Sequence, residues 1–136
     1  MSPNENIIFH LVDDNDIDIA VNTKLLQLSD ITPNIYAYNN ATKFLQAINA
    51  NQELYATKTH VVLLDIMMPG MNGFECLDEL SKLPEKIKTK LKVFMLSSSI
   101  DRNDIRLAES YDLVQRVLEK PLDIYLLKKT LEGIVE

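Results

Sequence analysis

Short apolar segments alternate along the chain with longer segments in which apolar residues recur at every third or fourth position. The first apolar segment, Ile7–Val12, runs directly into the polar stretch Asp13–Asp16, a pattern typical of a buried strand that ends in a loop. The most apolar segment, His60–Leu64, ends at Asp65 in the same way. Further strands are predicted over Ile35–Tyr38, Lys92–Leu96 and Val114–Glu119. The pattern therefore predicts five short strands.

The segments between these strands have the spacing of amphipathic helices. The first helix is expected to be capped by Asp16 and to end before Thr32–Asn34, where a proline breaks the pattern. Its predicted apolar stripe consists of Ile17, Val21, Leu25 and Leu28. The second helix is expected to begin at Asn39 or Asn40, the third to span Gly73–Leu83, and the fourth to begin at Asp101. The last helix is expected to carry the apolar stripe Ile124, Leu127, Leu131 and Ile134. Strands and helices thus follow one another in the order (βα)5.

This alternation predicts an α/β fold of the doubly wound class. Strands that are separated by helices pair in parallel through right-handed crossovers, and the helices then cover both faces of the sheet. The expected strand order is the flavodoxin-like 2-1-3-4-5, in which ligands bind at the carboxyl ends of the strands, between strands one and three. Chemistry is therefore expected at that edge of the sheet.

Length and composition indicate one soluble domain. The 136 residues contain 46% apolar and 25% charged residues, as in ordinary globular proteins, and no repeat or linker divides them. We expect a single domain over residues 1–136, with its core at about 6–135 and no attached output domain. The sequence predicts neither a signal peptide nor a membrane span, so a cytoplasmic location without a membrane partner is expected.

Charge and cysteine content exclude several function classes. The 14 basic and 20 acidic residues give a net charge of −6, so the chain lacks the basic surface that binds nucleic-acid phosphates directly. A single cysteine, Cys76, can form neither an internal disulfide nor a thiolate zinc site. His10 and His60 lie in predicted strands, where packing or a surface position is expected rather than a phosphoryl relay. All five tyrosines are expected to be half-buried.

Polar residues follow four of the predicted strands: Asp13 and Asp14, Asp65, Ser97 and Lys120. Each alone is typical of a turn or a helix cap. Together at one sheet edge, three carboxylates within about 5 Å would repel one another by roughly 3 kcal/mol per pair at an effective dielectric of about 20. A bound cation relieves that repulsion, and an all-oxygen ligand set favours Mg²⁺ over zinc.

The same residues form a recognisable signature. It comprises Asp13-Asp14, the stretch Asp65–Gly73 with the pattern D-x-x-M-P-x-M-x-G, Ser97, and Lys120-Pro121. Over almost its whole length the chain resembles the receiver domain of two-component response regulators, of the single-domain, chemotaxis type. The resemblance implies a phosphoacceptor in signal transduction that is phosphorylated by a sensor histidine kinase or a histidine phosphotransfer protein. A phosphorelay intermediate and a regulator of an unidentified downstream protein are both compatible with it.

The resemblance also implies a role for each site residue. Asp65 would accept the phosphoryl group from a phosphohistidine, while the Ser97 hydroxyl and the Lys120 ammonium would contact that group. Mg²⁺ would be bound by Asp14 and Asp65 directly, by Asp13 partly through water, and by the backbone carbonyl of Met67. The Lys120–Pro121 peptide bond would be cis. The chain would catalyse only its own phosphorylation and dephosphorylation, and no other enzyme activity is expected.

Several positions depart from the family pattern. Receivers usually carry Tyr or Phe three residues before the lysine, and here that position is Val117, which leaves the mechanism of switching open. The stretch Ala108–Val114 lacks the usual Gly-Ala turn. Met67 and Ser99 occupy the two positions that flank the path of the hydrolytic water. A thioether cannot orient water as an amide or a carboxylate can, so slow dephosphorylation is expected.

Three alternatives differ in their sequence requirements. A haloacid-dehalogenase-type phosphatase needs a second aspartate two residues after the first, where this chain has Met67. A pseudo-receiver, which docks partners without being phosphorylated, usually lacks one of the acidic residues or the lysine, and here all are present. A flavodoxin needs a hydroxyl-rich phosphate loop after the first strand, but the acidic stretch Asp13–Asp16 would repel a phosphate.

Overall fold

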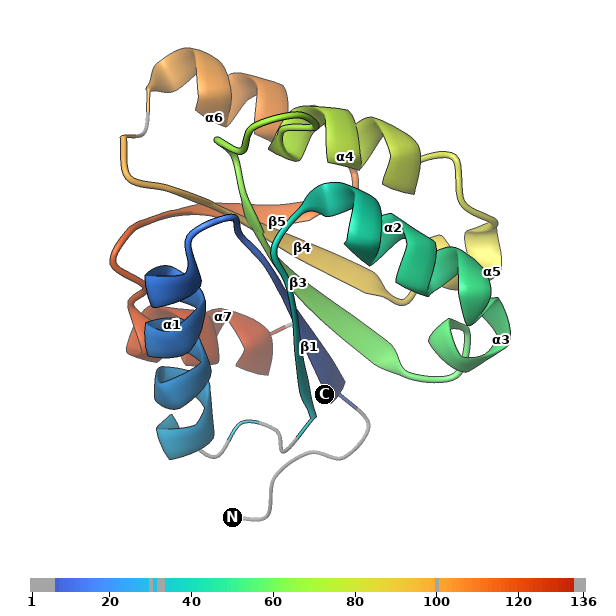
Figure 1. Ribbon diagram of the computed structural model, residues 1–136, viewed down its shortest axis with the longest axis horizontal. Coiled ribbons are helices and arrows are strands. Elements are labelled where there is room, and N and C mark those ends of the chain that lie inside the picture. Colours follow the sequence, from blue (N-terminus) through green and yellow to red (C-terminus); the bar gives the residue numbers. More distant parts are fainter. Residues whose placement is uncertain (1–6, 30, 32–33, 100, 134–136) are drawn as a thin grey trace.

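The computed structural model describes residues 7–29, 31, 34–99 and 101–133, and it confirms the predicted fold (Figure 1). A five-stranded parallel sheet has the order β2-β1-β3-β4-β5. The strands are β1 (Ile7–Val12), β2 (Ile35–Tyr38), β3 (Thr59–Asp65), β4 (Leu91–Ser97) and β5 (Val114–Glu119). The helices are α1 (Asp16–Ser29), α2 (Ala41–Ala50), α3 (Gln52–Tyr55), α4 (Gly73–Leu80), α5 (Glu85–Lys88), α6 (Arg102–Glu109) and α7 (Ile124–Glu132).

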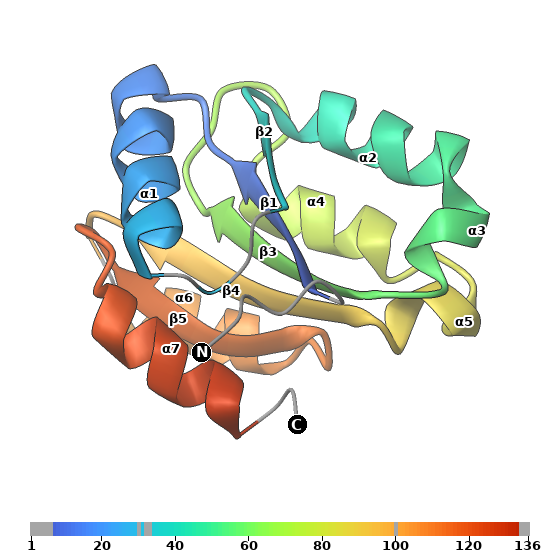
Figure 2. The same ribbon diagram turned by 90° about the horizontal axis from the view of Figure 1, so that it is seen from below.

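Helices cover both faces of the sheet, as expected for a doubly wound fold (Figures 1 and 2). On one face, Leu26 of α1 and Leu127 of α7 pack against Phe9 of β1 in one apolar cluster. On the other face, Phe44 of α2 and Leu77 of α4 belong to a second cluster, together with residues of α3, α5 and α6. The central strands are therefore buried on both sides, which explains why their sequences are continuously apolar. No described helix has the length and the apolar character needed to cross a membrane.

The predicted apolar stripe of the first helix is wrong for three of its four residues, because only Leu25 is partly buried and packs against the core. Ile17 and Leu28 are 74% and 72% exposed, whereas Leu26 is fully buried. Leu26 lies nine residues after Ile17, which is two and a half turns, so the two side chains point to opposite sides of α1. The periodicity identified the helix but not the side that packs. This leaves an exposed apolar stripe on α1 that includes Val21.

Helix ends and short helices account for the other differences. Asn15, not Asp16, caps α1, because its side chain accepts hydrogen bonds from the backbone N–H groups of residues 17 and 18. Asn40 and Asp101 cap α2 and α6, as predicted. The third predicted helix ends at Leu80 rather than Leu83. Two single-turn helices, α3 and α5, were not predicted because one turn carries no measurable periodicity.

Burial of the tyrosines differs from the expectation for three of the five. Tyr38 and Tyr111 are partly buried, as predicted. Tyr55 is buried, while Tyr36 and Tyr125 are 53% and 71% exposed. Tyr36 lies on β2 at the edge of the sheet, where only one neighbouring strand is available to cover it. The predicted stripe residue Ile134 lies outside the described residues.

Candidate functional site

The carboxyl ends of β1 and β3 bring three aspartates together. Val12 and Leu64 are paired in neighbouring parallel strands, so Asp13 and Asp65, which follow them directly, lie side by side. Asp13, Asp14 and Asp65 each offer a carboxylate oxygen, and these oxygens lie within 4.8 Å of one another. Asp13 and Asp65 are only 4% and 5% exposed, whereas Asp14 is exposed. The predicted acidic cluster is thus present at the predicted edge of the sheet.

Lys120 places its ammonium group among these carboxylates. Its Nζ atom donates hydrogen bonds to Asp13 Oδ2 at 3.0 Å and to Asp65 Oδ2 at 3.3 Å. The backbone fixes its position, since Lys120 N donates to the Ser97 carbonyl at 2.8 Å. The Lys120–Pro121 peptide bond is cis, as the resemblance implies. The end of β5 therefore supplies the positive charge that partly balances the acidic cluster.

A third carboxylate, Asp18, also binds Lys120 and was not anticipated from the sequence. Asp18 Oδ2 accepts a hydrogen bond from Lys120 Nζ at 2.9 Å, slightly shorter than the bonds to Asp13 and Asp65. Asp18 lies in the first turn of α1, four residues after Asp14. Asp14 precedes α1, so the rule that residues four apart share a helix face does not relate the two, and no signal in the sequence indicated this contact. Lys120 is therefore shared among three acidic groups from β1, α1 and β3.

Burial and the neighbouring charge of Asp13 change the protonation of Asp65. Burial, reinforced by the charge of Asp13, raises the pKa of Asp65 to about 6, although Lys120 acts in the opposite direction. Burial alone would lower the pKa of Lys120, but hydrogen bonds to Asp18 and Asp13 and the charge of Asp65 outweigh burial and hold it above its usual value. Lys120 thus remains charged, while the ionised form of Asp65 is disfavoured in this acidic surrounding.

The loop after β3 holds the Asp65 carboxylate in place. Met67 N donates a hydrogen bond to Asp65 Oδ1 at 3.2 Å, while the Met67 side chain is 72% exposed. Gly73 N donates to the Ile66 carbonyl at 3.0 Å, which closes the loop at the start of α4. Asn72 caps that helix in a capping box with Glu75. The loop therefore exposes Met67 beside the carboxylate and anchors both of its own ends.

The two predicted serines lie together at the end of β4. Ser97 follows Leu96, the residue paired with Asp65 across β3 and β4, so it lies beside the acidic cluster. Ser97 Oγ donates a hydrogen bond to the Ser99 carbonyl at 3.0 Å and accepts one from Ser99 N at 3.1 Å.

Val117 is partly buried on β5 and packs against the core cluster that contains Phe44 and Leu77.

The donor set of the cluster matches a hard divalent cation. All three groups that converge within 4.8 Å are carboxylates, and oxygen ligands are what Mg²⁺ prefers, together with retained waters. The exposure of Asp14 leaves room for such waters. Lys120 donates hydrogen bonds to Asp13 and Asp65 of this cluster, which shows that the cluster attracts positive charge. The residues present therefore fit a magnesium ion.

Comparison with known proteins identifies the family. Residues 9–132 match the model of the response regulator receiver domain. The chain belongs to this family. As a receiver domain, it has the architecture of a phosphoacceptor module of two-component signal transduction, which agrees with the fold and with the signature residues. Receiver domains typically bind Mg²⁺ at the acidic pocket, which here corresponds to the cluster around Asp65.

Individual relatives agree with this assignment. A response regulator receiver protein from Dyadobacter fermentans is 33% identical and superposes with a TM-score of 0.86, covering 93% of this chain and 96% of that chain. A two-component response regulator from Cytophaga hutchinsonii is 30% identical, with a TM-score of 0.82 and coverage of 97% and 98%. The nitrate/nitrite response regulator protein NarL of Escherichia coli K12 is 32% identical over 98 residues, which are 72% of this chain and 42% of NarL. The chain thus spans less than half the length of that curated relative.

Proposed function

We propose that Asp65 accepts a phosphoryl group from the phosphohistidine of a sensor histidine kinase or of a histidine phosphotransfer protein. The observation that carries this proposal is the arrangement around Asp65. Its buried carboxylate lies within 4.8 Å of two other carboxylates and 3.3 Å from the Lys120 ammonium. A purely structural aspartate would not be placed with two like charges. The arrangement suits a nucleophile that will carry added negative charge.

The chemistry requires little from the protein beyond position and charge. An Asp65 carboxylate oxygen attacks phosphorus, the P–N bond to the donor histidine breaks, and an acyl phosphate forms on Asp65. The transition state spreads negative charge over the equatorial phosphoryl oxygens. Lys120 neutralises part of that charge, and Ser97 donates its hydroxyl to a phosphoryl oxygen after breaking its bond with Ser99. Both groups already lie at the correct edge of the sheet.

The proposed metal ligands are the carboxylates of Asp13, Asp14 and Asp65 together with the backbone carbonyl of Met67. When bound, Mg²⁺ would offset the charge of the carboxylates and of the incoming phosphoryl oxygens. It would also favour the ionised form of Asp65, which is the nucleophilic form. Asp13 and Asp14 thus act by holding the cation, and Lys120, which follows the carboxyl end of β5, acts as a second positive charge at the same edge of the sheet.

Labelling with a small phosphodonor tests the proposed function. The chain is incubated with acetyl phosphate and Mg²⁺, and intact-mass analysis is expected to show one added phosphoryl group. Excess EDTA is expected to prevent labelling, because the carboxylates would then repel the donor. Absence of labelling with Mg²⁺ present would instead favour a docking module that works without phosphorylation. Sustained hydrolysis of phosphate esters would favour a phosphatase.

Replacing Asp18 with asparagine is expected to accelerate labelling by about two- to fivefold, a change of about 0.5–1 kcal/mol in the barrier. The substitution removes a negative charge near the site and a competitor for Lys120. Labelling is followed by quenched intact-mass measurements at several times. Asp16→Asn is the matched control, since it removes the same charge from the exposed side of the same helical turn. Equal rates for the two variants would contradict this role of Asp18.

Replacing Met67 with asparagine is expected to shorten the lifetime of the acyl phosphate severalfold. The Met67 side chain is 72% exposed next to Asp65, and an amide in its place can orient the attacking water. Decay is measured by intact mass after the donor is removed. Met67→Leu is the control, because leucine is similar in size and equally unable to orient water. A decay rate of the asparagine variant no higher than that of the leucine variant would exclude water access at Met67 as the limiting factor.

The output surface is proposed to comprise α6, β5 and α7. Movement of the loop that joins β4 to α6 would follow the Ser97 hydroxyl when it turns to the phosphoryl group. Val117, which is partly buried and packs against the core, lacks the aromatic ring that receivers usually carry at this position. The coupling is therefore proposed to pass through Ser97 and the β4–α6 loop to a downstream protein.

A further inference from the structure

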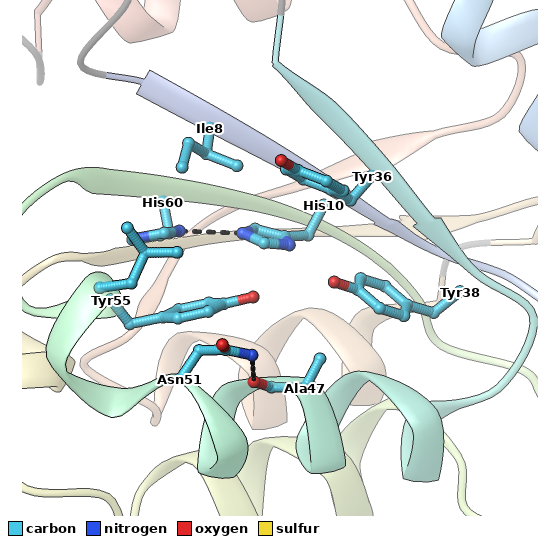
Figure 3. Close-up of a pocket in the computed structure, with 9 residues that line it drawn as sticks. Ile8, His10, Tyr36, Tyr38, Ala47, Asn51, Tyr55 and His60 are labelled. Carbon is cyan, nitrogen blue, oxygen red and sulfur yellow. Dashed lines mark hydrogen bonds between the residues drawn. The ribbon is translucent and has the colours of Figure 1, made fainter.

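A cavity of about 230 Å³ lies between the sheet and the helices α2 and α3 (Figure 3). Its lining includes Ile8, His10, Tyr36, Tyr38, Tyr55 and His60. His60 precedes Asp65 by five residues of β3, about 16 Å of extended strand, so the cavity is separate from the acidic site. Tyr36 and Leu54, 53% and 50% exposed, also line the cavity. They provide an opening to solvent.

The floor of the cavity contains two buried histidines that pair with each other. His10 Nε2 and His60 Nδ1 are 2.9 Å apart in a hydrogen bond. His10 is 1% exposed and His60 is 0% exposed. Their other ring nitrogens, His10 Nδ1 and His60 Nε2, are buried and have no hydrogen-bond partner among the described residues. Buried polar atoms without partners are costly, so these two nitrogens mark a place where a partner is missing.

The histidine pair is neutral and can act as both donor and acceptor. Burial, with the charge of His60, lowers the pKa of His10 to about 3, and burial, with the charge of Lys58, lowers that of His60 to about 4. A neutral imidazole carries one N–H, and one such proton is used between the rings. Whichever ring donates, one of the two outer nitrogens is then a donor and the other an acceptor. A ligand's N–H or O–H group can donate to the acceptor nitrogen, and a hydroxyl can instead accept from the donor nitrogen.

The walls of the cavity are flat, aromatic and uncharged. The Tyr55 ring lies 4.2 Å from the His60 ring at an angle of 11°. Tyr36 and Tyr38 each stack on His10 at 6.0 Å, with angles of 22° and 20°. The hydroxyls of Tyr38 and Tyr55 point toward each other beside His10 (Figure 3). None of the described lining residues is Asp, Glu, Lys or Arg, so nothing in the cavity favours a charged ligand.

We propose that this cavity binds a small neutral aromatic molecule, of the size of phenol or indole, that carries one N–H or O–H group. An apolar cavity of about 150 Å³ accepts benzene, so 230 Å³ is sufficient for one ring with a polar substituent or for two fused rings. The near-parallel rings provide stacking surfaces. The ligand enters past Tyr36 and Leu54, the exposed residues of the lining, and supplies the hydrogen-bond partner that the histidine pair lacks.

Titrations of the full chain with phenol and with indole test this proposal. The ring nitrogens of ¹⁵N-labelled histidine are followed by long-range ¹H–¹⁵N correlation NMR, which reports both tautomer and hydrogen bonding. Both compounds are expected to produce saturable shifts of His10 and His60. Benzene, which lacks the polar group, and cyclohexanol, which lacks the ring, are each expected to bind at least tenfold more weakly. Benzene binding as tight as phenol binding would overturn the role given to the histidines.

A pair of substitutions in α2 separates cavity binding from surface binding. Ala47→Leu fills the cavity that Ala47 lines and is expected to abolish the saturable shifts. Ala50→Leu places the same side chain at an exposed position of the same helix and is expected to leave them unchanged. Amide NMR spectra verify that both variants are folded. Saturable binding that survives Ala47→Leu, or no saturable shift with either compound in the wild type, would overturn the proposal.

Discussion

The Asp65→Asn variant is expected to take up no phosphoryl group from acetyl phosphate under conditions that label the wild type fully. An amide oxygen is a far weaker nucleophile than a carboxylate, and the other two carboxylates of the cluster follow β1, where Asp13 is already held by Lys120 and by Asn15 N. Intact-mass analysis measures the result. Labelling of this variant at the wild-type rate would show that Asp65 is not the acceptor.

Urea unfolding of the same variant shows whether its fold is intact and also tests the raised pKa of Asp65. The pKa of Asp65 is raised to about 6 from 3.8, so the folded state favours the protonated carboxyl. The resulting stabilisation is fully present below pH 3.8 and is lost as the pH rises through 6. Over that window the wild type is expected to lose about 1–3 kcal/mol of unfolding free energy relative to Asp65→Asn. Urea unfolding of both proteins at several pH values measures this difference.

The convergence of the site could be predicted from the sequence because parallel strands end at one edge. Asp65 and Lys120 each follow an apolar segment directly, so the order of the strands alone brings them together. The fold class followed from the alternation of segments, and the strand order was the flavodoxin-like one expected for that class. The site prediction depended on polar residues that directly follow the strands, and tertiary packing does not change their position at the strand ends.

Features that depend on packing between elements could not be predicted. The spacing of Ile17 and Leu26 allowed either side of α1 to face the sheet, and the side that is buried is the one that packs against the sheet and α7. Asp18 binds Lys120 because α1 lies beside the end of β5, a distance in sequence of 102 residues. His10 and His60 were each expected to pack or to lie at the surface, and their burial as a pair requires the register of β1 against β3, where Ile8 is opposite His60. Sequence periodicity contains none of this information.

Gly73→Ala is expected to destabilise the fold by about 2–4 kcal/mol and to slow the labelling of Asp65. A Cβ atom at residue 73 would lie 2.6 Å from the Asp65 carbonyl oxygen and 3.0 Å from Ile66 Cα, and these backbone atoms cannot move without shifting the Asp65 carboxylate. It would also lie 2.9 Å from Met95 Cε, the flexible end of a side chain that can rotate away.

Helix propensity alone predicts the opposite sign for this substitution, because Gly73 is the first residue of α4 and alanine in a helix is favoured over glycine by about 1 kcal/mol. Gly133→Ala is the control, since a Cβ atom there meets nothing closer than 3.7 Å, and its unfolding free energy is expected to stay within about 0.5 kcal/mol of the wild type.

Urea unfolding and labelling rates are measured for both variants. If Gly73→Ala unfolds at the urea midpoint of Gly133→Ala, the close approach of α4 to the Asp65 backbone does not constrain the site. A loss of stability with an unchanged labelling rate would show that the loop absorbs the clash without moving the carboxylate.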